Sequence, residues 1–368
     1  MIRNAADLVY APVGIAHLTG DNVDLLRSAA LGRSRLRITT AAQINGKPHF
    51  GTVAAVLAVF ALAEHASAVL DKPAEVVFDA LDNAPAVTVP ISGETYTRSV
   101  ADLVRAGGLE HSERFDGFTR LLEYAADRAG VPYTVRPYAE YQRLAPVREC
   151  LHTIAGHLEE FRPIVAPADG VVRIRPRCPH CRLVEKSARS LKITAVPGGD
   201  VLLASKCPLH GKYIETITQA GAGWYDANTP VRSVLKGFLL AAERDLYDAC
   251  TVSVDGADWG GAWHAHVLAP GLATLGVPPS NWPVSVFTPL IVDASGGKLS
   301  KTLYVQHGAY ADLPELMLNL DVLLATDEGI LDRVWDEVSG WVREPRRLHR
   351  SYSVEFLRRR LNLGAQAC

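Results

Sequence analysis

Two short cysteine-containing motifs carry side chains at spacings typical of metal ligands. Residues 178–181 read CPHC and residues 207–210 read CPLH, so the candidate ligands are Cys178, Cys181, Cys207 and His210. Each tight turn can present two ligands to one tetrahedral ion, and thiolates with an imidazole favour zinc over magnesium or calcium. Four protein ligands leave no open coordination position, so we expect a structural zinc site. The alternative is a chance pairing of inert buried thiols.

A histidine lies where a strand pattern passes into a helix pattern. The segment ITTAAQINGKPHFGT puts His49 directly before a long apolar run. Backbone N–H groups converge at the start of a helix, and the helix dipole there favours an anion. Gly51 permits close approach of a ligand to the backbone. His49 can therefore donate a hydrogen bond to a phosphate oxygen; the alternative is a structural histidine that is satisfied inside the protein.

A second candidate phosphate-binding segment is rich in glycine and lysine. The stretch DASGGKLSKTL puts Lys298 and Lys301 three residues apart. Two ammonium groups on one loop can close over a polyphosphate and stabilise the charge that develops on a leaving group. The alternative is a solvated loop with ordinary surface lysines.

The elements that must position these residues alternate between strand and helix patterns. Apolar or β-branched strand patterns occupy residues 35–42, 74–81, 250–256 and 284–293. Helix patterns occupy residues 51–70, 117–129, 231–249 and 262–276, and two amphipathic helices follow Lys301. Strands separated by helices predict βαβ units and a parallel sheet. The expected fold class is therefore α/β.

The expected organisation has five parts. We predict an N-terminal extension (1–34), a first half of a Rossmann-like catalytic domain (35–170) and a zinc-ribbon insertion (171–216). The second half of the catalytic domain with the lysine loop (217–310) and a helical C-terminal region (311–368) follow.

Composition narrows the class of protein. The 368 residues are 48% hydrophobic and carry a formal net charge of −2, so a large core is expected and no global basic field attracts nucleic acid. The N-terminus lacks the basic-then-apolar plan of a signal peptide, and the longest apolar run contains Glu64 and His65. Six cysteines do not make a disulfide scaffold in a chain of this size. We expect a soluble cytoplasmic protein without a membrane span.

The two candidate phosphate-binding segments together resemble the signature motifs of class I aminoacyl-tRNA synthetases. PHFGT resembles the His-Ile-Gly-His element of the family at His49 and Gly51, with Thr52 in place of the second histidine. KLSKT resembles the Lys-Met-Ser-Lys-Ser element of the family. The segment ITTAAQINGKPHFG is similar to methionyl-tRNA synthetases, and the Cys-rich insert and the RSYSVEFL tail are similar to class I lysyl-tRNA synthetases. The resemblance covers about residues 35–330, although only the short motifs are specific.

The resemblance implies an ATP site and an amino-acid site. The implied ATP-binding residues are His49, Gly51, Thr52, Gly256, Asp258, Lys298, Ser300 and Lys301, of which His49, Lys298 and Lys301 are the expected catalytic residues. The implied contacts to the amino-acid substrate are Thr40, Asp79, Asp82 and His264. ATP with Mg²⁺ is the expected co-substrate. The alternative for Asp79 and Asp82 is a helix cap or a surface acid, and His264 is offset by one residue from the family histidine.

Three functions are compatible with these motifs. The first is transfer of an activated amino acid to a small amine or hydroxylamine, similar to the synthetase-like ligase domains of natural-product pathways such as hydrazine synthetases. The second is a truncated methionyl- or lysyl-tRNA synthetase-like enzyme that charges tRNA. The third is a non-catalytic regulatory paralogue. His49, Lys298 and Lys301 favour an enzyme, and the few residues after the lysine loop and the near-neutral charge favour the small acceptor over tRNA.

Overall fold

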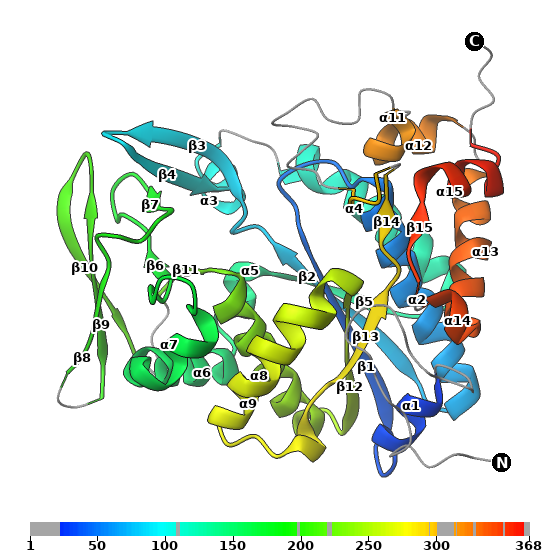
Figure 1. The fold of residues 1–368 in the computed structure, drawn as a ribbon, viewed down its shortest axis with the longest axis horizontal. Helices are drawn as coiled ribbons and strands as arrows, with labels where there is room; N and C mark the ends of the chain where they lie inside the picture. Colours follow the sequence, from blue (N-terminus) through cyan, green and yellow to red (C-terminus); the bar gives the residue numbers. More distant parts are fainter. Residues whose placement is uncertain are drawn as a thin grey trace.

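The computed structural model of the chain describes residues 23–107, 111–196, 199–218, 223–293, 295–299, 313, 315–326, 329–348 and 350–363. Figure 1 shows a central sheet with C-terminal helices on its right and smaller sheets on its left. The helices are α1 (Val23–Ala29), α2 (Phe50–Leu70), α3 (Val100–Arg105), α4 (His111–Ala129), α5 (Tyr138–Tyr141), α6 (Ala145–Gly156), α7 (Leu158–Val165), α8 (Thr229–Leu246), α9 (Ala269–Thr274), α11 (Glu315–Leu318), α12 (Leu320–Thr326), α13 (Ile330–Arg343), α14 (Pro345–Leu348) and α15 (Val354–Arg360).

The central sheet has five parallel strands in the order β13-β12-β1-β2-β5. The strands are β13 (Val284–Thr288), β12 (Ala249–Gly256), β1 (Arg35–Gln43), β2 (Ala74–Leu81) and β5 (Tyr133–Pro137). Most residues of β1, β2 and β12 are buried, as expected for strands that are covered by helices on both faces. The predicted α/β class with a Rossmann-like parallel sheet is confirmed.

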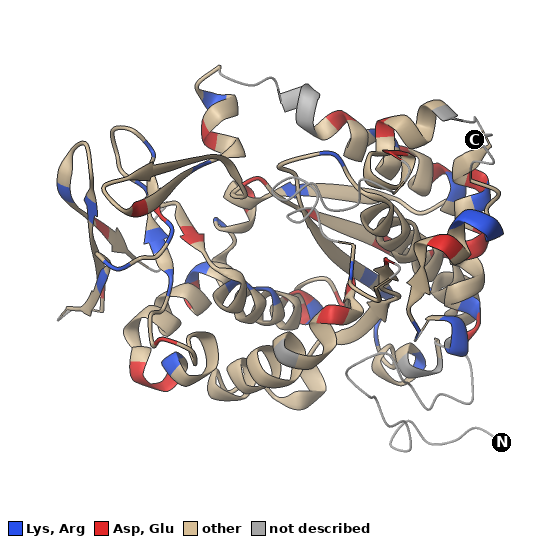
Figure 2. Cartoon of the chain, turned by 45° about the horizontal axis from the view of Figure 1, so that its top comes forward, with Lys and Arg blue, Asp and Glu red and all other residues tan. Residues whose placement is uncertain are grey.

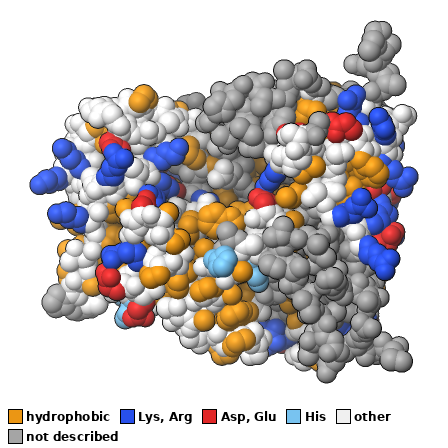
Figure 3. Space-filling view, in the orientation of Figure 1, with side chains coloured by type: hydrophobic (Ala, Val, Ile, Leu, Met, Phe, Trp, Pro, Cys, Tyr) orange, Lys and Arg blue, Asp and Glu red, His pale blue; other side chains and the backbone are white. Residues whose placement is uncertain are grey.

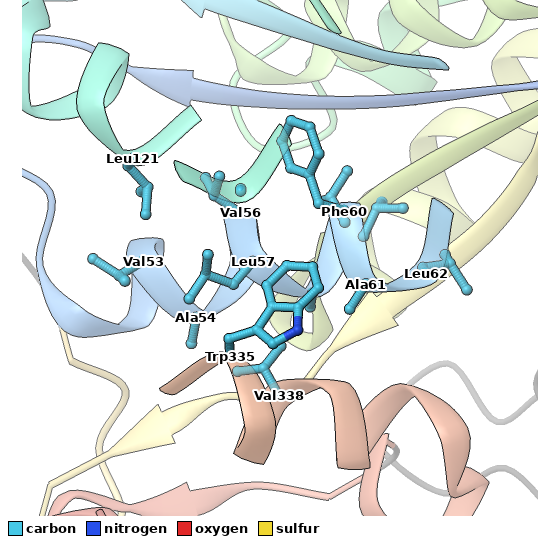
Figure 4. Packing of buried hydrophobic residues seen from close by; sticks show 14 of the residues in the cluster. Val53, Ala54, Val56, Leu57, Phe60, Ala61, Leu62, Leu121, Trp335 and Val338 are labelled. Atoms are coloured by element: carbon cyan, nitrogen blue, oxygen red, sulfur yellow. The ribbon is translucent and has the colours of Figure 1, made fainter. Parts of the chain in front are cut away.

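Helix α2 fills the space between the sheet and the C-terminal helices. Its apolar side chains are buried nearly all round, and Figure 4 shows Leu57 and Ala54 beside Trp335 and Val338 of α13, with Leu121 of α4 on another side. This helix is long and apolar enough to cross a membrane, but 61% of its most apolar window is buried inside the molecule. The packing explains the composition, because a helix that is apolar on all sides belongs in a core.

A second core joins the segments that flank the predicted insertion. Tyr138, Ile154 and Phe161 from α5, α6 and α7 cluster with Leu203 and with Leu235 of α8. The small sheets here are β10-β9-β8 (Gly211–Ile217, Val201–Cys207, Lys192–Ala195), β11-β6 (Tyr225–Ala227, Ile174–Pro176) and β3-β4-β7 (Pro85–Ile91, Glu94–Ser99, Val184–Glu185). Because β4 pairs with β7, the predicted insertion is hydrogen-bonded to a hairpin that follows β2.

Two segments near the centre depart from simple helix and strand patterns. The predicted strand at residues 284–293 is divided into β13 and β14 (Ile291–Val292), and β14 pairs with β15 (Tyr352–Ser353) of the C-terminal region. In place of one predicted helix at residues 262–276, the chain forms a π-helical segment η3 (Gly260–Leu268) and then the short α9, and a 3₁₀ turn η2 (Ala257–Trp259) precedes them. A short 3₁₀ turn η4 (Pro279–Asn281) precedes β13. π-Helical turns are rare and occur frequently at functional sites.

Candidate active site and metal centre

Two adjoining cavities lie where the strand order of the central sheet reverses. The chain leaves β1 toward β2 on one side and returns to β12 on the other, and such a switch point is where open α/β sheets bind ligands. We call the first the Asp79 cavity (250 Å³) and the second the His49 cavity (280 Å³). They share a wall that contains residues 41–43 of β1 together with Ala55, Gly256, Trp259 and Thr288.

His49 occupies the position directly before α2. Its backbone is extended (φ −83°, ψ 166°), and its carbonyl oxygen accepts hydrogen bonds from the N–H groups of Thr52 (2.8 Å) and Val53 (3.1 Å). The Thr52 hydroxyl oxygen lies 3.4 Å from Nε2 of the imidazole. A Cβ atom at Gly51 would lie 2.9 Å from Cε1 of His49, so glycine makes room for the ring. His49, Gly51 and Thr52 all line the His49 cavity.

The lysine loop is closed by an aspartate. The Asp293 carboxylate accepts hydrogen bonds from the N–H groups of Ser295 and Gly297, each at 2.9 Å, and from the Ser295 hydroxyl at 2.6 Å. The Ser295 side chain is the main cause of the lowered pKa of Asp293. Leu299 is buried and its N–H donates to the Ile291 carbonyl at 2.9 Å. The loop therefore holds Lys298 in the lining of the His49 cavity.

The residue expected to bind the ribose, Asp258, and a residue expected to bind the phosphates, Lys298, contact each other in the His49 cavity. The Lys298 ammonium lies 2.5 Å from the Asp258 carboxylate, and these side chains are 45% and 33% exposed. A Cβ atom at Gly256 would lie 2.6 Å from Asp258 Oδ1, so glycine allows this carboxylate to fold back. An exposed pair is worth only about 0–1 kcal/mol, so a nucleotide could replace it at little cost. Ser300 and Lys301 lie outside the described residues.

A chain of buried ion pairs begins at Asp79. Arg136 binds the Asp79 carboxylate with two N–H groups (2.6 and 3.2 Å) and Glu243 with a third (2.8 Å). Arg37 then bridges Glu243 (3.1 Å) and Glu75 (2.7 Å). Burial raises the pKa of Asp79, and the Arg136 guanidinium offsets that increase only in part. The negative charge of Asp79 is therefore only partly balanced, and a further cation that reached the carboxylate would stabilise its ionised form.

A second ion pair faces the Asp79 cavity from β12 and α8. The Lys236 ammonium lies 3.1 Å from both carboxylate oxygens of Asp255, and the Ser253 hydroxyl donates to Asp255 at 2.8 Å. Thr40, at the carboxyl end of β1, lines the same cavity. Asp255 lies just before Gly256, near the carboxyl end of β12. Ligands bind at the carboxyl ends of parallel strands, so this position was a signal in the sequence for a residue of the site. No motif in the sequence marks Lys236 or Arg136.

Two of the residues predicted for the amino-acid site lie apart from both cavities. Asp82 is buried in the turn after β2, where its N–H donates to the Ala80 carbonyl at 2.9 Å. His264 lies in the π-helical segment, 3.1 Å from the Ser285 hydroxyl, and burial lowers its pKa. Neither residue is among those that line the Asp79 cavity or the His49 cavity.

The four predicted metal ligands converge. Their ligand atoms all lie within 4.8 Å of one another: Cys181 Sγ is 3.5 Å from Cys207 Sγ, and Cys178 Sγ is 3.6 Å from His210 Nδ1. Ligand atoms bound tetrahedrally to zinc at about 2.3 Å are separated by roughly 3.8 Å, whereas a disulfide bond is about 2.05 Å long. Cys207 and His210 come from the β9–β10 turn, where Gly211 has a φ of +78°. The cluster could hold a metal ion such as zinc.

The comparisons with known proteins give only distant structural similarity. No protein-family model and no curated protein sequence matches the chain. The methionyl-tRNA synthetase of Mycobacterium tuberculosis, solved with methionyl-adenylate, is similar with 14% identity and a TM-score of 0.41 over 90% of this chain and 69% of that one. The glutamate-tRNA synthetase of Elizabethkingia anophelis is similar with 15% identity and a TM-score of 0.33 over 74% of this chain and 54% of that one. At these values the similarities establish neither a family nor an activity.

Proposed function

We propose that this protein activates an amino acid with ATP, forms an aminoacyl adenylate and passes the aminoacyl group to a small amine or hydroxylamine. The observation that carries the proposal is the shared wall of the two cavities at the strand switch point. One cavity has cationic and helix-terminal groups suited to phosphates, and the other has the buried carboxylate of Asp79, which is suited to an ammonium group. The two cavities meet at the residues that line both of them, so substrates that occupy the two cavities can lie next to each other and react there.

The His49 cavity would bind ATP. His49, the N–H groups at the start of α2 and Lys298 line one side of it, and all of these favour anions. An α-carboxylate oxygen of the amino acid attacks the α-phosphorus, a new P–O bond forms, and the P–O bond to pyrophosphate breaks. The departing pyrophosphate carries the electron pair, and His49, Lys298 and Lys301 stabilise its charge. Mg²⁺ enters with ATP as the counter-ion of its phosphates.

The Asp79 cavity would bind the amino acid. An ionised Asp79 can accept a charge-assisted hydrogen bond from the substrate ammonium, because Arg136 occupies only part of its hydrogen-bonding capacity. Thr40 is proposed to contact the same substrate from β1. Asp82 and His264 are proposed to act only behind this cavity, since neither lines it.

The proposed acceptor is a small nucleophile. Its nitrogen attacks the carbonyl carbon of the adenylate, the C–O bond to phosphate breaks, AMP leaves with the electron pair, and the nitrogen loses a proton to water. The C-terminal arginines are partly occupied, since Arg347 and Arg360 bind the buried Glu337 at 2.7 and 3.0 Å. Together with the net charge of −2, this occupation favours a small acceptor over a polyanion. The zinc ion is proposed to be structural, because its four ligands leave no open position.

ATP–pyrophosphate exchange, measured with each amino acid in turn and without tRNA, tests the activation step. We expect exchange with one amino acid or a few similar ones, and its loss in His49→Ala. Adding small amines and hydroxylamines to the active combination should then give a condensed product and AMP by mass spectrometry. Absence of exchange with every amino acid would contradict the proposed function.

Charging of tRNA is a second candidate, favoured by a basic surface on the insertion. Figure 3 shows Lys and Arg side chains gathered over this region at the left, and Figure 2 shows them along its strands. Lys206 and Lys212 are exposed and face each other across the β9–β10 pair. Like charges directly opposite are unfavourable unless an anion binds between them. Salt-dependent binding of total tRNA that is weakened by changing both lysines to Ala, together with aminoacylation, would support this candidate over the small acceptor.

A further inference from the structure

Arg232 is the charged residue of the Asp79 cavity that lacks a carboxylate partner in the part of the chain that the structure describes. The cavity is lined by four charged side chains: Asp79, Arg232, Lys236 and Asp255. Arg136 pairs with Asp79, and Lys236 pairs with Asp255. The Arg232 guanidinium donates to the Thr229 hydroxyl at 3.2 Å, and no carboxylate oxygen of a described residue is paired with it. Among the described residues, the cavity thus presents one cation that no carboxylate pairs with.

The surroundings of Arg232 also favour an anion. Arg232 lies in the first turn of α8, a helix of 18 residues, and Thr229 of that turn and the following residue Ser233 also line the cavity. The positive end of the helix dipole adds to the guanidinium charge. The capping residue Asn228 makes no side-chain hydrogen bond to the helix, so it does not satisfy the first N–H groups.

Tyr141 provides a second donor in the lining of the Asp79 cavity. Its side chain is only 5% exposed, and its hydroxyl has no hydrogen-bond partner in the described parts of the chain. Burial raises the pKa of this phenol well above its ordinary value, so the hydroxyl stays protonated and can donate. A buried hydroxyl without a partner is costly, and a ligand oxygen would remove that cost.

We propose that the Asp79 cavity selects an amino acid whose side chain carries a carboxylate, and that Arg232 recognises this carboxylate. The inference rests on the proposed function in one respect. Activation requires the α-carboxylate to meet ATP at the shared wall, whereas Arg232 lines only the Asp79 cavity. The guanidinium is therefore left for the side chain of the substrate. A cavity of 250 Å³ suits a small amino acid such as aspartate or glutamate.

Other side chains fit this cavity less well. A basic side chain would meet Arg232 and Lys236, and Asp255 is already bound by Lys236 and Ser253. An apolar side chain would remove water from the guanidinium without replacing its hydrogen bonds, which is unfavourable. An amide of the same shape can accept one hydrogen bond but lacks the charge, so the acid and its amide are the most informative pair of ligands.

The test compares acidic amino acids with their amides in the parent, in Arg232→Gln and in Arg143→Gln. Arg143 is exposed, lies two residues from Tyr141 and lines neither cavity, so it is a control for the same loss of charge. We expect the parent to bind and activate glutamate or aspartate at least tenfold better than glutamine or asparagine. Arg232→Gln should lower kcat/KM for the acid about 10- to 100-fold, the loss of a charge-assisted hydrogen-bonded pair, and Arg143→Gln should not. Tyr141→Phe should weaken binding of the acid less than Arg232→Gln does.

Calorimetry without ATP separates this inference from the proposed function. Exchange that prefers a neutral or basic amino acid would overturn the inference and leave the proposed function standing. Binding of an acidic amino acid that weakens in Arg232→Gln, with no exchange for any amino acid, would support the inference and overturn the proposed function. Equal effects of Arg232→Gln and Arg143→Gln on binding would also overturn the inference. Thermal unfolding is measured for each variant first, so that binding and activity are compared only among folded proteins.

Discussion

The two cavities at the switch point differ in how their charged groups are held. In the Asp79 cavity, Asp79 is buried and fixed by Arg136, which is itself fixed by Glu243, and all three belong to strands or a helix. In the His49 cavity, Lys298 pairs with Asp258, and Lys47 of the same lining pairs with Asp321; all four side chains are 29–45% exposed. The first set of charges is locked in place, whereas the second can rearrange.

This difference matches what each proposed substrate requires. A small amino acid is recognised by charges at fixed positions, because buried groups without partners penalise the wrong ligand. A triphosphate changes its charge distribution during the reaction, and cations on a loop can follow that change and close over it. Changes in the Asp79 cavity should therefore disturb stability and affinity, while changes in the His49 cavity should mainly disturb the rate.

The largest effect is expected for Arg136→Met. Removing this guanidinium leaves Asp79 and part of Glu243 buried without their partner, which costs about 3–5 kcal/mol in comparable cases. Urea unfolding should show this loss, and pyrophosphate exchange should disappear with it. Arg143→Met, an exposed arginine near the same cavity, is the matched control. A change below about 1 kcal/mol, the value of a surface pair, would contradict the difference between the cavities.

Next in size are His49→Ala and Lys298→Ala. Each removes a group that is proposed to stabilise charge on the phosphates, so exchange should slow by about 100- to 1000-fold. The free energy of unfolding should change by less than about 1 kcal/mol for Lys298→Ala, since its partner is exposed. The rate of ATP–pyrophosphate exchange is measured at saturating amino acid from samples quenched at successive times. A parent-like rate in both variants would make the lysine loop an ordinary surface loop.

A smaller effect concerns pH and the amino-acid affinity. The pKa of Asp79 in the folded protein is raised by burial above its ordinary value of 3.8. A group with a raised pKa in the folded state contributes stability below its unfolded pKa, and that contribution is lost as pH rises through the folded pKa. Binding of an ammonium needs the ionised form, so affinity should fall as pH decreases through a value above 3.8. Calorimetry at a series of pH values measures this affinity, with the Asp79→Asn variant as control. A pH midpoint of the affinity at or below 3.8 would contradict the prediction.

The smallest effect on the chemistry is expected at the metal centre. Cys181→Ala, or removal of metal by a chelator, should lower the stability of the insertion because metal binding contributes folding free energy. The cluster lies within the predicted insertion (171–216) and none of its ligands lines either cavity, so exchange per folded molecule should change far less than in His49→Ala. Elemental analysis should find one zinc per chain. A folded, active preparation without bound metal would contradict the structural role.

The sequence predicted those parts of the molecule that depend on local pattern. Strands β1, β2, β12 and β13 followed from runs of β-branched and apolar residues, and the metal ligands followed from their spacing. The hairpin β3–β4 was not predicted, although Val87, Val89 and Ile91 alternate along β3 and its two-residue turn has positive φ at both positions. Its pairing with β7 joins distant segments and could not be read from local pattern.

The partners of the predicted site residues could not be read from local pattern either. Arg136 and Glu243 are far from Asp79 in the sequence. The pairing of β2 with β5 places Arg136 beside Asp79, and Glu243 reaches Arg136 from helix α8. Lys236 and Arg232 lie on α8, an amphipathic helix whose sequence has no motif that distinguishes these two residues from ordinary surface cations. Their role became visible only when the cavity that they line was known.

Transfer of ¹⁸O from the carboxylate of the amino acid to AMP tests the central claim most directly. If the two cavities serve one reaction, the α-carboxylate oxygen becomes bonded to the α-phosphorus and remains there when the acceptor displaces AMP. Mass spectrometry of the nucleotide after complete conversion should therefore find one ¹⁸O atom in each AMP. Label in inorganic phosphate together with ADP, or no label in AMP, would contradict an adenylate formed across the shared wall.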